Sequence, residues 1–165
     1  MSLLAFCRWL ESTPGSVALH ESIWVYPIVE SVHVLTLCIF LGLTVILDLR
    51  LLGATLPATP VSQIVRRFLP WTVAGFAIMV VTGALLFYAI PVKTYLNIFF
   101  RLKVVFLLMA GLNVAIFQRT ASPTISRWDL DPRPPFRARL AGAVSLALWA
   151  AIVVCGRMIA YNWFD

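Results

Sequence analysis

Four long apolar runs constrain this chain more than any other feature of its sequence. They cover residues 23–47, 68–90, 97–118 and 138–160. A helix needs about 20 apolar residues to cross a bilayer, and each run reaches that length. With 61% hydrophobic residues, 12% charged residues and a mean hydropathy of +0.93, the chain is predicted to be an integral membrane protein. Its fold class is therefore all-α, a membrane four-helix bundle over residues 23–160.

Short segments are expected on both sides of the bundle. Residues 1–22 are predicted to form an amphipathic N-terminal segment that lies on the membrane surface. Pro14-Gly15 divides it, and Ser16 is expected to cap the second of its two short helices. Residues 161–165 form a short tail. We expect no cleavable signal peptide, because no basic segment followed by a sustained apolar core begins the sequence.

The basic residues predict the orientation of the bundle. Eight of the 13 Lys and Arg residues lie in or beside the loops after the first and third runs. Such residues favour the cytoplasmic side, so both termini are expected in the periplasm of a bacterial inner membrane. Aromatic residues typical of the membrane interface gather at the expected outer ends: Trp24, Tyr26, Tyr88, Tyr95, Tyr161 and Trp163. Because orientation explains the net charge of +6, we expect no nucleic-acid partner.

Two of the apolar runs carry ionisable side chains at membrane depth. Glu30 and His33 are three residues apart and share one helix face. Arg101 and Lys103 lie near the start of the third run. With a rise of 1.5 Å per residue, Glu30 and Lys103 reach similar depths, roughly 10 Å from the outer surface, with His33 just below and Asn113 deeper. The sequence therefore predicts a polar pocket in the outer half of the bundle, where Glu30 and Lys103 meet.

Each of these side chains also has a structural interpretation. Glu30 with Lys103 or Arg101 is a possible buried ion pair that sets helix register. Arg101 is long enough to reach the lipid headgroups. His33 and Asn113 are possible hydrogen-bonding links between helices.

The segment LDLRLLG places two further charged residues at the inner end of the first run. Asp48 and Arg50 are expected to pair with each other, or with Arg66 and Arg67, and to serve the fold. The three cysteines show neither a metal-binding nor a disulfide spacing, and none is expected to bind a ligand.

The pocket residues favour haem over a metal ion bound directly. Other runs supply no carboxylate at the depth of Glu30, so a dinuclear centre is not expected, and a mononuclear site that adds His20 is a weaker alternative. Haem asks for an axial His, a second ligand or open position, and a cation for its propionates. Haem b is thus the first candidate cofactor, with His33 on the iron and Lys103 as second ligand or anion partner. Glu30 would orient His33, and Arg101 would hold a propionate. A quinone is the alternative ligand.

Three segments resemble the membrane core of a known family. They read SVHVLTLCIFLGLTVILDLRLLG, RRFLPWTVAGFAIMVVTGALLF and FFRLKVVFLLMAGLNVAIF. Together they resemble the HemJ-type protoporphyrinogen oxidases and, more loosely, the copper-resistance D-type membrane domain. In the HemJ-type family an early His and a later Lys are tied to haem binding and activity, which implies those roles for His33 and Lys103. A second family His has no counterpart, because Gly111-Leu112-Asn113 stand in its place. The pattern W-x-Y-P…E-x-x-H…D-L-R-L-L-G is also similar to an uncharacterised bacterial four-span family.

These observations leave several functions open. The first hypothesis is a membrane protein that binds haem b or a similar redox ligand, for electron transfer or HemJ-like oxidation. The alternatives are a non-enzymatic accessory or scaffold subunit, and a transporter of a metal ion or small solute. Expected partners are the lipid bilayer and either further copies of the chain or a larger membrane complex. Small residues in the runs allow the close helix approach that such assembly needs: Gly75, Gly83, Gly111 and Gly142.

Overall fold

Four long helices dominate the structure. The computed structural model describes residues 2–161, and within that range it contains helices and no strands. The helices that are long and apolar enough to cross a membrane are α3 (Val25–Leu52), α4 (Val61–Ala89), α6 (Ile98–Thr120) and α8 (Phe136–Met158). The prediction of an all-α, four-span bundle is therefore confirmed. The predicted tail at 161–165, Trp163 included, lies outside the described residues except for Tyr161.

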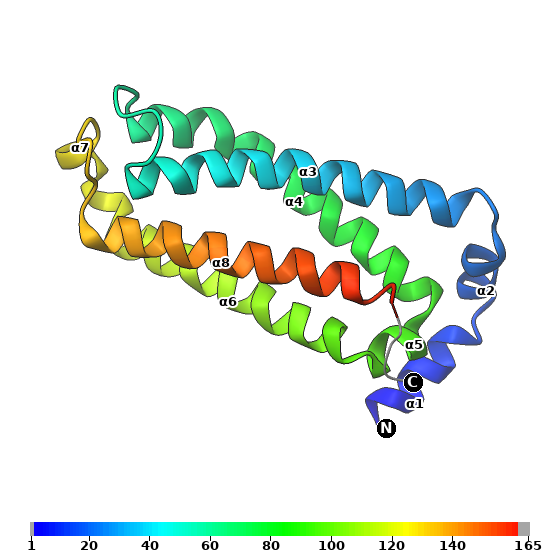
Figure 1. The fold of residues 1–165 in the computed structure, drawn as a ribbon. Coiled ribbons are helices and arrows are strands. Elements are labelled where there is room, and N and C mark those ends of the chain that lie inside the picture. Colours follow the sequence, from blue (N-terminus) through cyan, green and yellow to red (C-terminus); the bar gives the residue numbers. More distant parts are fainter. Residues whose placement is uncertain (1, 162–165) are drawn as a thin grey trace.

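Shorter helices cover the two ends of the bundle. One end, called here the terminal end, carries α1 (Leu3–Glu11), α2 (Pro14–Glu21) and α5 (Pro91–Leu96), and α8 finishes there (Figure 1). The opposite end, called the loop end, carries the connections after α3 and α6, including α7 (Ile125–Trp128).

The long helices pack in the order α4, α3, α8, α6. α3 packs against α4 and α8, while α6 packs against α8 (Figure 1). α3 and α6 make no backbone contact over the described residues, so they are not neighbours. This arrangement separates the helix that carries Glu30 and His33 from the one that carries Lys103.

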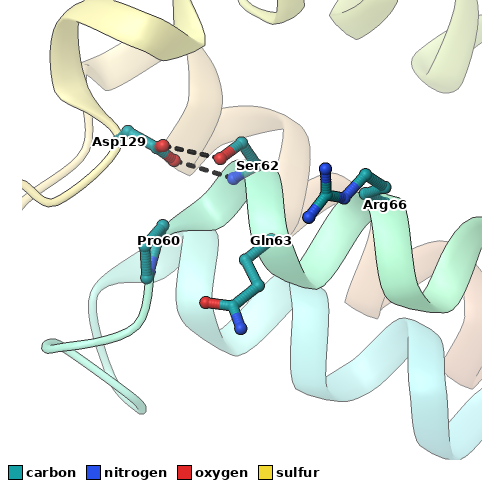
Figure 2. A pocket seen from close by; sticks show the side chains of 5 residues that line it. All are labelled: Pro60, Ser62, Gln63, Arg66 and Asp129. Atoms are coloured by element: carbon teal, nitrogen blue, oxygen red, sulfur yellow. Dashed lines mark hydrogen bonds between the residues drawn. The ribbon is translucent and has the colours of Figure 1, made fainter.

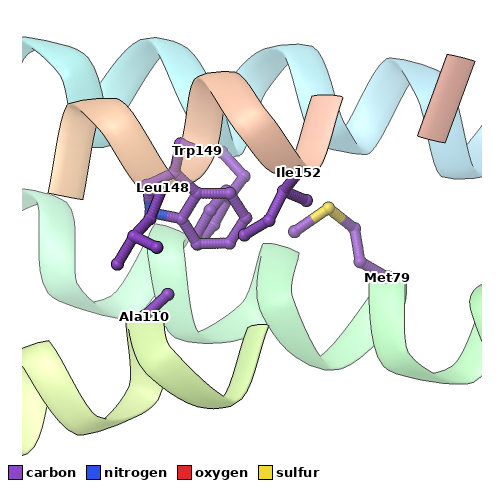
Figure 3. Packing of buried hydrophobic residues seen from close by; sticks show 6 residues of the cluster. Met79, Ala110, Leu148, Trp149 and Ile152 are labelled. Atoms are coloured by element: carbon purple, nitrogen blue, oxygen red, sulfur yellow. The ribbon is translucent and has the colours of Figure 1, made fainter. Parts of the chain in front are cut away.

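An apolar layer fills the middle of the bundle (Figure 3). Its centre is an edge-to-face contact between Phe40 of α3 and Trp149 of α8, whose ring centroids are 4.7 Å apart. Such aromatic pairs add about 0.5–1.5 kcal/mol beyond the area that they bury. The cluster as a whole comprises Phe40, Met79, Ala110, Leu148, Trp149 and Ile152.

The outward faces of the long helices are as apolar as this layer. Leu35 of α3, Val81 of α4 and Leu108 of α6 are 65%, 60% and 70% exposed, respectively. A water-soluble monomer rarely exposes apolar area on this scale, whereas hydrocarbon solvates it without cost. Because the backbone polar groups of these faces are paired within helices, the surface suits a lipid bilayer.

The N-terminal segment is fastened to α4. Thr13 caps α2 by accepting a hydrogen bond from the Ser16 amide, so the prediction that Ser16 is the cap is wrong. The Thr13 hydroxyl lies 2.8 Å from the Tyr88 hydroxyl, and the Ser16 hydroxyl donates to the Tyr88 carbonyl at 2.7 Å. Buried Ser16 therefore holds the N-terminal segment against α4, and it does not cap α2.

A buried arginine ties the loop end together. Arg50 is fully buried, and its guanidinium donates to the backbone carbonyls of Thr59, Asp131 and Asp129 at 3.0, 3.2 and 3.2 Å. These carbonyls belong to the connections after α3 and α6. A guanidinium offers five donors in a rigid fork, which suits it to join two loops at once.

Asp48 does not pair with this guanidinium, so the expected Asp48–Arg50 ion pair is absent from the described residues. Asp48 is buried beside the Ser145 hydroxyl of α8. There α3 and α8 cross so closely that a Cβ at Gly142 would lie 2.9 Å from the Asp48 carbonyl oxygen. The structural role predicted for both residues stands, although their partners differ.

Removal of Arg50 is expected to destabilise the loop end. Arg50→Ala would remove three hydrogen bonds, although the Asp129 carbonyl would keep the one from the Val61 amide, and it should lower the free energy of unfolding in mixed micelles by about 3 kcal/mol. Arg67→Ala, an exposed change at the same end, should alter it by less than about 0.5 kcal/mol. Equal effects of the two changes would contradict a connecting role for Arg50.

Candidate functional site

His33 faces the bundle, where it meets α4. Its Nδ1 atom lies 2.8 Å from the Thr82 hydroxyl oxygen. His33 follows the start of α3 by eight residues and Thr82 precedes the end of α4 by seven, which puts both about 10–12 Å from the terminal end. The imidazole is half-buried, and Thr82 is buried.

The hydrogen bonds of Thr82 define which His33 nitrogen carries a proton. The Thr82 hydroxyl donates its only hydrogen to the Ile78 carbonyl at 2.7 Å. It can therefore only accept from His33, so Nδ1 is the donor. In neutral His33 the lone pair then resides on Nε2, which leaves this nitrogen able to bind a ligand.

Lys103 approaches the same region from α6. A Cβ atom at Gly156 would lie 3.5 Å from Lys103 Nζ, so the ammonium rests over the last turn of α8, beside Cys155. The negative end of the α8 dipole favours a cation at this place. Lys103 also lies near enough for its charge to act on the His33 ring. One side chain from each long helix thus borders the site: His33, Thr82, Lys103 and Cys155.

Two glycines lie against the ionisable side chains. A Cβ atom at Gly83 would lie 3.4 Å from His33 Cε1, at the limit of ordinary contact. Gly156 plays the matching part beneath Lys103. The imidazole therefore lies close to the backbone of α4, and the ammonium lies close to the backbone of α8.

The structure does not bring Glu30 into this site. Glu30 is exposed and interacts with Tyr26, one turn earlier on α3. Among residues 2–161 no carboxylate acts on Lys103, so the expected contact between Glu30 and Lys103 is wrong. The physical reason is that the Glu30 side chain is on the exposed face of α3, and that α3 and α6 are not neighbours; equal depth alone could reveal neither.

The two remaining predicted residues lie apart from His33. Arg101 is exposed; it donates to the Tyr95 carbonyl at 3.0 Å and its guanidinium stacks over the Tyr95 ring at 5.0 Å. Asn113 of α6 donates to the Ala141 carbonyl of α8 at 2.9 Å, nearer the loop end. Arg101 thus reaches toward the terminal end, and Asn113 joins two helices.

Sequence reasoning missed the part that Thr82 and the two glycines play at this site. Thr82 and Gly83 lie at the same depth as His33 on the next apolar run. This shared depth is the sequence signal that could have indicated the contact. The described residues contain no group of three or more His, Cys, Asp and Glu side chains placed to hold a metal ion. His33 and Lys103 remain as the predicted polar side chains of this region.

Comparison with known proteins identifies a family and no activity. Residues 15–162 match a family of unknown function (DUF6644). No curated protein and no solved structure matches the chain.

Asn113 is expected to contribute stability rather than ligand binding. Asn113→Leu removes the hydrogen bond to α8 and should lower the free energy of unfolding by about 0.6–1.7 kcal/mol, the range for interhelical bonds in membranes. Gln118→Leu, an exposed change on the same helix, is the control and should have a smaller effect. Both can be measured by denaturant titration in mixed micelles. Loss of a bound ligand without loss of stability would contradict this assignment.

Proposed function

Because the chain belongs to DUF6644, a family of unknown function, we propose a function from its geometry: it binds a b-type haem near the terminal end of the bundle and carries electrons within the membrane. The proposal depends chiefly on one observation, the hydrogen bond from His33 Nδ1 to Thr82. The resemblance of roughly residues 30–118 to the HemJ-type membrane core supports the choice of His33 and Lys103.

His33 has the surroundings of an axial ligand. Histidines that ligate a metal almost always donate their other ring N–H to a neighbouring acceptor, which holds the ring and raises the basicity of the ligating nitrogen. Thr82 is that acceptor here, in the role expected of Glu30. Gly83 lets the Cε1 edge of the ring pack against the backbone of α4.

Lys103 supplies the cation that a haem propionate needs. Its ammonium is half-buried and has no carboxylate partner among the described residues. A half-buried charge without a partner is costly in an apolar bundle, and a bound anion would offset that cost. Bound haem would supply a one-electron couple, while His33 orients it, Lys103 binds its acidic edge and the apolar layer around Trp149 keeps water from its deeper side.

We assign the loop end to the cytoplasm. Seven exposed arginines at or beside that end support this orientation by the positive-inside rule: Arg66, Arg67, Arg119, Arg127, Arg133, Arg137 and Arg139. Both termini and the haem site then lie toward the periplasmic face of a bacterial inner membrane.

A second candidate is an accessory subunit of a larger membrane complex. Over the described residues of α6 only Ala110 is buried, so most of this helix is free to meet another chain. In this case the polar side chains near the terminal end would only hold helices together. The two candidates differ in what His33 does, which the following experiment measures.

The purified protein is expected to show a Soret band, either as isolated or after addition of hemin. His33→Ala should abolish the band, whereas His20→Ala, which changes the exposed histidine of α2, should retain it. Thr82→Val should keep the band but weaken haem affinity by about 10- to 100-fold, because Nδ1 loses its acceptor.

A protein with no Soret band after hemin addition would reject the haem proposal. If a quinone is then found in an organic extract and is lost in His33→Ala, the ligand is a quinone. If neither ligand binds and His33→Ala only lowers thermal stability, the accessory role is correct.

Lys103 is expected to hold the acidic edge of the ligand. Lys103→Gln should weaken hemin binding by about tenfold, the effect of losing one charge-assisted hydrogen bond. Arg101→Gln is the matched control, since Arg101 is occupied by Tyr95. Hemin titration followed by absorbance measures both. An equal loss in both variants would show that only the net charge of the terminal end matters.

A further inference from the structure

The loop end contains a recess that the haem proposal does not use. Pro60, Ser62, Gln63, Arg66 and Asp129 line it, and its volume is about 280 Å³ (Figure 2). Four of these residues belong to the first turns of α4 or precede it directly, while Asp129 comes from the connection after α6. The hydrogen bonds of Asp129 bring the two segments together.

Both oxygens of the Asp129 carboxylate are held in place. Oδ1 accepts from the Ser62 amide at 2.7 Å and Oδ2 from the Ser62 hydroxyl at 2.6 Å. A carboxylate can accept about four hydrogen bonds, so each oxygen retains a lone pair. Behind the carboxylate, the buried Arg50 holds the Asp129 carbonyl. The negative end of the recess is therefore rigid and still able to accept a donor.

Arg66 forms the positive side of the recess. It lies across Ser62 from Asp129, and it forms no hydrogen bond or ion pair with another described residue (Figure 2). Gln63 adds a neutral amide to the lining on a side away from both (Figure 2). The lining thus carries one positive and one negative side chain, which suits a ligand that is itself a zwitterion.

An apolar track leads from the recess into the membrane. Leu69, Val73 and Phe76 follow Arg66 along one face of α4 and are 50%, 59% and 45% exposed. Arg66 lies about 7 Å from the start of α4, where the sequence changes from polar to apolar. A ligand that fits both parts needs a zwitterionic head and an acyl chain.

We propose that this recess binds the headgroup of phosphatidylethanolamine from the adjoining leaflet. Arg66 receives the phosphate, Asp129 accepts hydrogen bonds from the primary ammonium, and one acyl chain lies along the α4 track. Phosphatidylcholine lacks ammonium N–H donors, and phosphatidylglycerol brings no cation to Asp129. The geometry therefore selects the ethanolamine headgroup among common phospholipids.

The test is lipid retention by the full-length protein in native mass spectrometry. Delipidated protein is titrated with phosphatidylethanolamine, phosphatidylcholine or phosphatidylglycerol of matched acyl chains. The ethanolamine lipid should be retained best. Arg66→Gln should lower its retention by about tenfold, because a charge-assisted hydrogen bond is lost. Arg67→Gln, which changes a neighbouring exposed arginine outside the recess, should have no effect.

Asp129→Asn tests the other end of the headgroup. This variant should erase the preference for ethanolamine over choline while phosphate binding persists. The control is Ser62→Ala, which loses one hydrogen bond to Asp129 but keeps the carboxylate charge. Lipid preference and thermal unfolding are measured for both variants. If Ser62→Ala erases the preference for ethanolamine equally, the Asp129 carboxylate stabilises the loop end and does not bind the ammonium.

Three results would overturn the proposal. Equal retention of the three lipids would show a nonspecific surface, and preference for phosphatidylglycerol would show that the arginines of the loop end act together. Competition by soluble phosphoethanolamine at the same concentration as the lipid would mean that the α4 track contributes nothing, so the ligand would not be a membrane lipid.

Discussion

Polar groups within an apolar bundle need partners inside the protein, and the rest of this structure depends on how that demand is met. Arg50 satisfies it with three carbonyls from two loops, and Asn113 with one carbonyl of the neighbouring helix. One of the two ring nitrogens of His33, Nδ1, has a partner in Thr82. Lys103 has no carboxylate partner among the described residues, and under the proposed function the ligand supplies one.

The apolar layer around Phe40 and Trp149 divides the bundle into two halves. His33 and Lys103 lie on the side of the terminal end, while buried Asp48 lies beside Ser145 on the side of the loop end. A packed apolar layer of this kind favours a site that opens toward one end of the bundle.

α4 connects the two proposed sites. Near the terminal end it supplies Thr82 and Gly83, which hold and admit the His33 ring. At the loop end it supplies Ser62 and Arg66 to the recess. Glycine and threonine occur where the backbone of α4 must approach another side chain, whereas charged and amide side chains occur where the helix leaves hydrocarbon. The lipid proposal stands independently of the haem proposal, because the two use different ends of this helix.

The sequence by itself determined the four membrane helices, because apolar runs of that length have few other stable arrangements. It also identified His33 and Lys103 as side chains that hydrocarbon does not tolerate alone. Only the tertiary structure decided their partners. Depth along a helix follows from residue number, but neighbours follow from which helices adjoin, so Glu30 matched Lys103 in depth and still lies away from it. The contacts of Thr82 with His33 and of Gly156 with Lys103 follow from the packing of α3 on α4 and of α6 on α8. Side-chain packing, and not hydropathy, selects those helix pairs.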